Sequence, residues 1–433
     1  MSQPPVIARR SGIWARAPDI LLLQLFEHGV RAALHDDGLP FALRVSHVCR
    51  YWRAVAAASP SVWTAVPVHP PRAGLAELFF ARAGGHLPLD VCLHLRSERK
   101  ADAALAFVLA QNERIRAVCL HAQGNPAVFL FISRLRRMTL PRLAHFEIYL
   151  HLNPKGGPLG HLPPILDPEP PPTLTSVALR GVCFELHSAM LKGLTSLTLA
   201  DLPRRMAAPS YTTFRDLLTA SPNLSHLRLA GVFPVLAHEI DYGEIVLARL
   251  QTLELAMERD ASYVCDFFLV LCAPDIHTLA FESPWAATWQ GFEDALPILD
   301  ASFALVRTLR LRATGDVAAS GAGARPELFR CFPRLAYLTL TAARDALVLH
   351  YLRPWLAVMQ GQCGGEFADG DAPCAVPVWP HLELLTVRAP FDSGDADEDD
   401  DEEGIDDALE FLGSLRLSMD LPFEVWQECV SSA

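Results

Sequence analysis

A six-residue pattern of apolar and polar positions recurs along most of the chain. It reads apolar-x-x-apolar-x-apolar, and most copies begin 20 to 31 residues after the previous one. The last two apolar positions point to the same face of a β-strand, and one short strand cannot bury that face alone. Neighbouring copies that lie side by side form a parallel sheet with a continuous interior. Copies begin at Ile115, Leu143, Leu174, Leu194, Leu224, Leu250, Ile276, Val306, Leu335 and Leu382, with a weaker one at Leu412.

The segments between these strands have helical spacing, as the crossover connections of a parallel sheet require. Examples are Phe214–Leu218, Phe267–Leu271 and Phe292–Leu299. Residues 76–95 fit the same scheme, as a helix followed by a strand that alternates from Leu89 to Leu95. The fold class predicted for residues 71–433 is therefore α/β, a curved repeat solenoid with a parallel sheet. An ordinary α/β domain with leucine-rich strands is the alternative.

Three insertions interrupt the period. Residues 154–172 are too rich in proline for a helix or a central strand, and residues 313–325 are rich in glycine and alanine. Residues 392–407 carry eleven acidic side chains and no basic one, so we expect a solvated loop. That loop could bind a basic partner or, weakly, calcium.

The first 70 residues have a different pattern and form a separate predicted domain of short helices. Pro18 and Asp19 start a helix with a broad apolar stripe, and a loop is expected from Gly29 to Pro40. A second helical pattern runs from Leu43 to Val55 and stops at Ser59-Pro60, before Trp63. A helical module this small cannot bury all of its apolar groups, so it tends to need a partner surface.

The order and spacing of Pro18-Asp19, Leu25-Phe26, Val48-Cys49, Trp52-Arg53 and Trp63 resemble the F-box motif over about the first 65 residues. Two positions depart from it. Ala17 stands where many family members have leucine, and Ile20 where they have an acidic residue. The repeats that follow resemble the irregular leucine-rich repeats found after an F-box in fungal proteins.

The resemblance implies a substrate receptor of a ubiquitin ligase. The F-box would dock on a Skp-type adaptor, which links it to a cullin scaffold, and the repeats would hold a target protein. It also implies which residues form or support the adaptor surface; a plain helical core is the alternative reading of each. They are Pro18, Leu22, Leu25, Phe26, Val45, Val48, Cys49 and Trp52.

Residues between the apolar anchors point to the exposed inner face of the sheet, where the resemblance places the target. The candidates are Arg228, Glu254, His277, Arg307, Arg310, Arg312 and Tyr337, with Thr339 beside them. Each could also be an ordinary solvated strand residue. The three arginines 307, 310 and 312 form the best local cluster and suit an acidic or phosphorylated ligand.

Charge and cysteine content indicate which partners and which cellular compartment to expect. Without residues 392–407 the formal charge is close to neutral, so we expect no nucleic-acid partner. No apolar run approaches a membrane span, and the run from Ile20 to Phe26 is short for a signal peptide. The ten cysteines are scattered singly, which favours a reducing compartment, the cytoplasm or the nucleus.

No enzyme motif is found. The chain has no glycine-rich nucleotide motif, no HExxH, no GxSxG and no paired cysteine–histidine cluster, so neither a cofactor nor a metal is expected. Cys49 is expected on the apolar face of a helix, where burial lowers reactivity. We therefore expect a receptor without catalytic residues. A repeat scaffold that binds a protein without any role in ubiquitin transfer is the alternative.

Overall fold

The computed structural model describes residues 17–32, 39–69, 73–95, 102, 105–106, 108–136, 138–151, 171–182, 191–200, 210–231, 243–257, 267–283, 303–313, 331–342, 381–389 and 424–429. The chain divides into two compact units, residues 1–190 and residues 191–433. Each unit is described by itself. The boundary expected at residue 70 falls inside the first unit.

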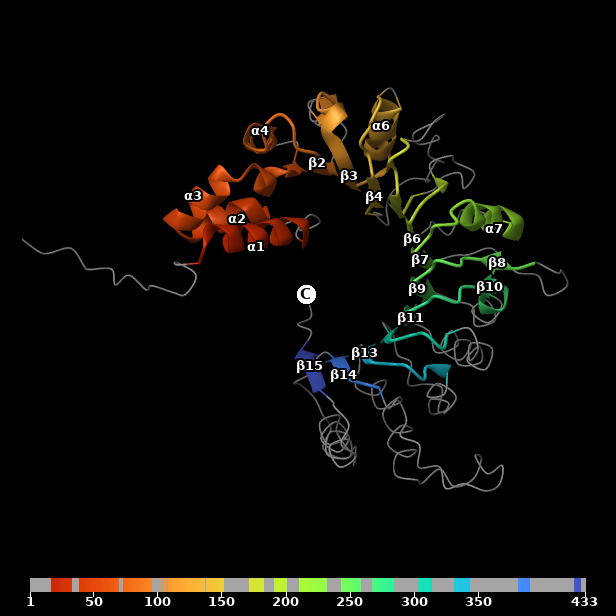
Figure 1. Cartoon of the computed structure of the whole chain (residues 1–433). Coiled ribbons are helices and arrows are strands. Elements are labelled where there is room, and N and C mark those ends of the chain that lie inside the picture. The colour runs from red at the N-terminus through yellow and green to blue at the C-terminus, as the bar shows by residue number, and fades with distance from the viewer. Residues whose placement is uncertain are drawn as a thin grey trace, which may run out of the picture. The chain divides into compact units, whose positions relative to one another are not determined.

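The first unit begins with three short helices that pack together in Figure 1: α1 (Asp19–Ala32), α2 (Phe41–Val48) and α3 (Arg50–Ala58). A 3₁₀ turn, η2 (Pro60–Trp63), follows them. In α1 the buried residues are Leu22, Phe26 and Val30, which are spaced four apart and so lie along one side of the helix. This side faces the other helices.

Two details of these helices differ from the prediction. Helix α1 continues past Gly29 to Ala32, and the glycine leaves room for the ring of Phe41 against the helix. The single helix expected from Leu43 to Val55 is broken at Cys49, which is extended at φ −158° and ψ 174°. Its thiol accepts a hydrogen bond from the Trp52 backbone N–H at 3.5 Å and so caps α3.

A parallel sheet completes the first unit. Its strands are β1 (Ala65–Val68), β2 (Leu89–Leu95), β3 (Ile115–Ala122), β4 (His145–Leu150) and β5 (Ser176–Arg180), in that order. Helix α4 (Ala73–Arg82) precedes β2, as predicted. The turn η4 (Asn112–Arg114) precedes β3, and α6 (Asn125–Leu135) follows it. Figure 1 shows α6 beside β3 and β4, and Phe131 of α6 stacks on Phe146 of β4 at 6.2 Å.

The second unit continues the same architecture. Its main sheet has the order β6 (Ser196–Ala200), β7 (His226–Gly231), β9 (Thr252–Met257), β11 (Thr278–Ser283), β12 (Thr308–Ala313), β13 (Tyr337–Ala342), β14 (Leu384–Ala389) and β15 (Glu424–Cys429). Helix α7 (Tyr211–Thr219) connects β6 to β7. Two short strands, β8 (Ile245–Val246) and β10 (Leu271–Cys272), pair with each other. Figure 1 shows α7, β8 and β10 on the same side of the main strands.

The same backbone hydrogen bonding recurs from one strand to the next. The carbonyl of Thr195 accepts two bonds, from the N–H groups of Ser225 and His226 at 2.8 and 3.1 Å. The carbonyl of His277 accepts the corresponding pair from the strand that follows it. Leucines of neighbouring strands are buried in matching register, as in the row Leu253, Leu279, Leu309 and Leu338 across β9, β11, β12 and β13. The predicted α/β architecture with a large parallel sheet is confirmed.

Several expectations fall wholly or mostly outside the described residues. These are the helix at Phe292–Leu299, the weak copy at Leu412, and the insertions at 154–172, 313–325 and 392–407. The described strand next to β14 is β15, which the pattern does not predict. The helix expected at Phe267–Leu271 gives way to β10 at Leu271. In the described part of the chain, no helix combines the length and apolarity needed to span a bilayer.

Candidate binding surfaces

The residues predicted to form the adaptor surface separate into two groups. Leu22, Phe26 and Val45 are buried and form the core of the helices, with Cys49 and Trp52 half-buried beside them. Phe26 and Trp52 contact each other, with ring centroids 5.1 Å apart. These five residues hold the helices together.

The other three, Pro18, Leu25 and Val48, are exposed. Leu25 is 47% exposed and Val48 59%, and Leu21, one turn before Leu25 on α1, is 51% exposed. Ile20 adds a further exposed apolar side chain at the start of α1. We call Ile20, Leu21, Leu25 and Val48 the exposed apolar group.

Trp63 fixes this helical region to the rest of the first unit. Its ring is fully buried, and its indole N–H donates to the Ala56 carbonyl at 2.7 Å. The ring meets Phe79 of α4 edge to face at 5.0 Å, and the Arg82 guanidinium lies 4.2 Å from its centre. The helices therefore have a rigid attachment, which a docking surface needs in order to hold its shape.

A hollow of about 210 Å³ lies on the exposed face of the second unit's sheet. The bottom of the hollow is lined by a small side chain, that of Ala280 on β11. Ala280 lies in register between Glu254 on β9 and Arg310 on β12. Ala256 lies beside it on β9. Larger polar side chains from neighbouring strands rise around this floor: Arg228, Glu254, Glu282, Arg310, Arg312, Thr339 and Thr341.

Positive charge exceeds negative charge by one around the hollow. Arg228 pairs with Glu254 at 2.9 Å, and Arg312 lies 3.6 Å from Glu282. Arg310 is exposed and has no ion pair among the described residues. A guanidinium with its donors available suits a carboxylate or a phosphate, which it binds through two parallel hydrogen bonds.

The structure thus brings together four of the predicted target-binding residues, Arg228, Glu254, Arg310 and Arg312, with Thr339. It does not bring the other three to the hollow. His277 and Arg307 precede their strands, and their carbonyls accept the recurring backbone bonds, while their side chains are exposed. Tyr337 lies one row away, where its hydroxyl donates to Glu383 at 3.0 Å, which raises the pKa of the tyrosine.

The first unit contains a second arrangement that the sequence analysis missed. Imidazole and phenol rings stack across its strands on one face of the sheet. His94 lies 4.4 Å from His69 and 4.8 Å from His121, and Tyr149 lies 5.0 Å from His121. The Arg180 guanidinium closes the series, 4.4 Å from the Tyr149 ring centre. This ring ladder runs across β2 to β5.

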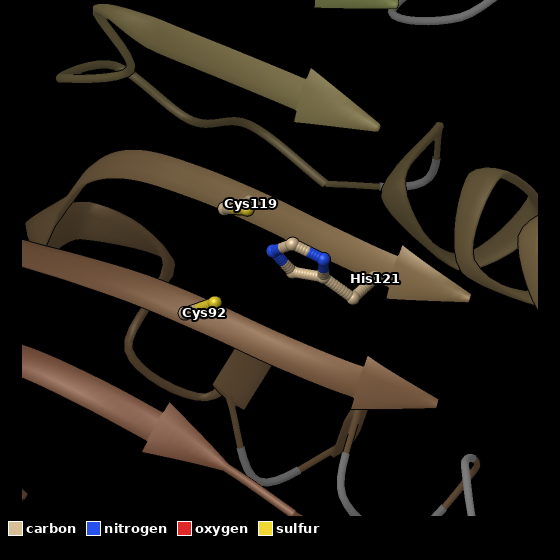
Figure 2. Close-up of side chains that lie close together, drawn as sticks. All are labelled: Cys92, Cys119 and His121. Atoms are coloured by element: carbon tan, nitrogen blue, oxygen red, sulfur yellow. The ribbon is translucent and has the colours of Figure 1, made fainter. Parts of the chain in front are cut away.

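Two buried cysteines lie next to the ladder, one residue row away. Cys92 on β2 is directly opposite Cys119 on β3, just as His94 is opposite His121. The two Sγ atoms and a ring nitrogen of His121 all lie within 4.8 Å of one another. Figure 2 shows the His121 ring turned back along its strand, between the two sulfur atoms. We call Cys92, Cys119 and His121 the thiol–imidazole cluster.

The cluster stabilises one thiolate. The pKa of Cys92 is lowered to about 3, chiefly by a hydrogen bond from the Cys119 thiol. His121 and His94 lower it too, while burial acts in the opposite direction. The pKa of Cys119 is raised, because its proton is held by Cys92 and because the group is buried.

A signal for this cluster exists in the sequence. The pentapeptides Val91–Leu95 and Val118–Ala122 share Val-Cys-Leu-His and stand 27 residues apart, within the range of the repeat period. Residues one repeat apart lie side by side on neighbouring strands, so equal positions meet. Metal motifs of the CxxC type lie within one short segment, whereas this pair of cysteines forms only when two neighbouring repeats lie side by side.

Comparison with known proteins gives no family assignment. The chain matches no family model, and a search of curated proteins finds no match either.

Proposed function

We propose that the chain is the substrate-recognition subunit of a cullin-based ubiquitin ligase. Helices α1 to α3 dock on a Skp-type adaptor as an F-box, and the strands that follow form a leucine-rich-repeat solenoid that holds a target protein. The chain contributes no catalytic group. Ubiquitin transfer is accelerated because the bound target is held close to the charged enzyme, which other subunits supply.

The observation that carries the proposal is the exposed apolar group on α1 and α2. Leu21 and Leu25 are each about half exposed although the same helix buries Leu22 and Phe26 fully. Burying an exposed leucine against a partner contributes about 1.5–3 kcal/mol at most, so a few such residues are enough to dominate an interface. Two members of the group, Leu25 and Val48, are among the residues that the resemblance to the F-box implies as adaptor contacts.

The repeated backbone geometry supports the second half of the proposal. Each strand of the second unit pairs in parallel with the next at the same register positions. A stack of such strands presents a wide polar face of the kind that repeat proteins use to bind partners. The hollow around Arg310 gives that face a positive centre, which favours an acidic or phosphorylated segment of the target.

Binding of the purified full chain to a purified Skp-type adaptor tests the proposal, with calorimetry as the readout. The variant Leu21→Ala/Leu25→Ala removes exposed side chains only, so the helices should stay folded. We expect at least about a tenfold loss of affinity, since covering the exposed half of each leucine contributes roughly 1 kcal/mol. Substitution of Phe26 is unsuitable, because this ring is 1% exposed and its loss disrupts the helices themselves.

The matched control is Val246→Ala/Leu269→Ala, which removes two equally exposed aliphatic side chains from the second unit. It should bind the adaptor like the unaltered chain. If the unaltered chain does not bind any Skp-type adaptor, the ubiquitin-ligase role is wrong. The alternative is then a repeat scaffold that binds a protein partner without any role in ubiquitin transfer.

A further inference from the structure

The thiol–imidazole cluster has the donor atoms of a metal site rather than of an ordinary core. Buried cysteines pack as small hydrophobic groups, and each would then need only apolar neighbours. Here Cys92 and Cys119 face each other, and His121 places an imidazole against both sulfurs. Two thiols and one imidazole, converging from two strands, form a set of soft and borderline ligands.

The distances agree with coordination of one ion. In a tetrahedral zinc site with two sulfur ligands and one nitrogen ligand, the bond lengths place ligand atoms about 3.5–3.8 Å from one another. The three donor atoms lie within 4.8 Å of one another. Small rotations of the side chains close the difference of about 1 Å that this leaves.

The surroundings of the cluster provide a supporting contact. A hollow of about 30 Å³ lies against Cys92 and His94 on the side of the cluster toward Phe41 and Ala42 of α2. The His94 Nε2 atom lies 3.3 Å from the Cys92 sulfur, so His94 either orients this ligand or approaches the open fourth position.

We propose that Cys92, Cys119 and His121 bind a zinc ion that joins β2 to β3. Zinc is favoured over calcium or magnesium because those ions take oxygen ligands, and no carboxylate belongs to the cluster. The ion would cross-link two neighbouring strands of the first unit next to the helices. Its role is structural, and it stands independently of the ubiquitin-ligase proposal.

Metal content and cobalt substitution of the purified full chain test this site. Prepared under reducing conditions with zinc present, the chain should hold one zinc ion per molecule by mass spectrometry of the elements. Cobalt(II) added to the chain after a chelator has removed the zinc should give the thiolate-to-metal charge-transfer absorption that only sulfur ligation produces. The cobalt experiment uses the unaltered chain, so it does not depend on whether a variant folds.

Variants identify the ligands. Cys92→Ser/Cys119→Ser should lose the zinc and the charge-transfer band, and His121→Ala should lose the zinc. Cys331→Ser, which alters another buried cysteine in the second unit, should keep both signals. Circular dichroism shows whether a variant that loses the metal is still folded. Where a variant unfolds, the zinc content and the cobalt band of the unaltered chain remain the test of the site. Absence of zinc and of the cobalt band from the unaltered chain overturns the proposal, as does a Cys92–Cys119 disulfide under reducing conditions.

Discussion

Cys92 and Cys119 lie directly opposite each other on neighbouring parallel strands, and each begins the same Cys-Leu-His tripeptide. Alternation along a strand then carries both histidines to the same face as the sulfurs. The result is a square of two cysteines and two histidines across β2 and β3. It follows from a short sequence repeated once at the spacing of the strands.

If zinc binds the thiol–imidazole cluster, its removal should lower the thermal stability of the first unit. A ligand present at a hundred times its dissociation constant adds about 2.7 kcal/mol to the free energy of unfolding. For a unit of this size, a loss of that magnitude lowers Tm by roughly 5–10 °C. Calorimetry with and without a strong chelator measures the shift. The Cys92→Ser/Cys119→Ser variant serves as the control, and a shift of equal size in that variant would show that the chelator acts elsewhere.

His94 and His121 should differ in their effect on the metal. Because His94 contacts the Cys92 sulfur rather than completing the cluster, we treat it as a positioning residue. His94→Gln should weaken zinc binding by about 10- to 100-fold, the usual effect of removing an outer contact, and leave the cobalt band present. Competition with a metal-sensitive dye gives the affinity. Complete loss of the cobalt band in the folded variant would make His94 a ligand.

Trp63 should be the largest single contributor to stability among the aromatic residues of the helical region. Trp63→Ala removes a fully buried ring, its bond to the Ala56 carbonyl, and its contacts with Phe79 and Arg82. We expect the free energy of unfolding to fall by about 3–5 kcal/mol. Val48→Ala, at an exposed position of the same region, should change it by less than about 0.5 kcal/mol. Denaturant titration measures both, and equal effects would contradict the packing described for Trp63.

Arg310 and Arg307 provide a matched test of the hollow. Both are exposed arginines of the same strand region, but only Arg310 lines the hollow. With a library of acidic and phosphorylated peptides as the probe, Arg310→Ala should weaken capture of the best ligand at least tenfold, since removal of a paired charge costs about 2 kcal/mol or more. Arg307→Ala should leave the affinity within about a factor of two. Equal losses would place the ligand outside the hollow.

Much of the architecture is predictable from the sequence, because burial of a strand face imposes a period of two that leucines mark plainly. The positions from Leu224 to Leu229 repeat at Leu250 to Leu255 and lie side by side as predicted. The break at Cys49 is not predictable in this way. Apolar residues continue through it at helical spacing, and the two helices are separated by the extended backbone of Cys49, whose thiol caps α3.

The candidate site residues are likewise only partly predictable from the sequence. Sequence patterns identify which side chains leave the core, but they do not say which row of the sheet these occupy. Arg310 and Arg312 therefore reach the hollow while Arg307, three residues earlier than Arg310, does not. Among the predicted adaptor contacts, the motif could not separate exposed Leu25 from buried Phe26, its neighbour in the chain.

The most direct test of the account is hydrogen exchange of the full chain with and without a saturating Skp-type adaptor, read by mass spectrometry. The account predicts slower exchange in peptides from α1 and α2, with the peptides of β9 to β12 unchanged. Protection confined to the second unit, or no protection in α1 and α2 at saturation, would contradict the assignment of the helical docking face.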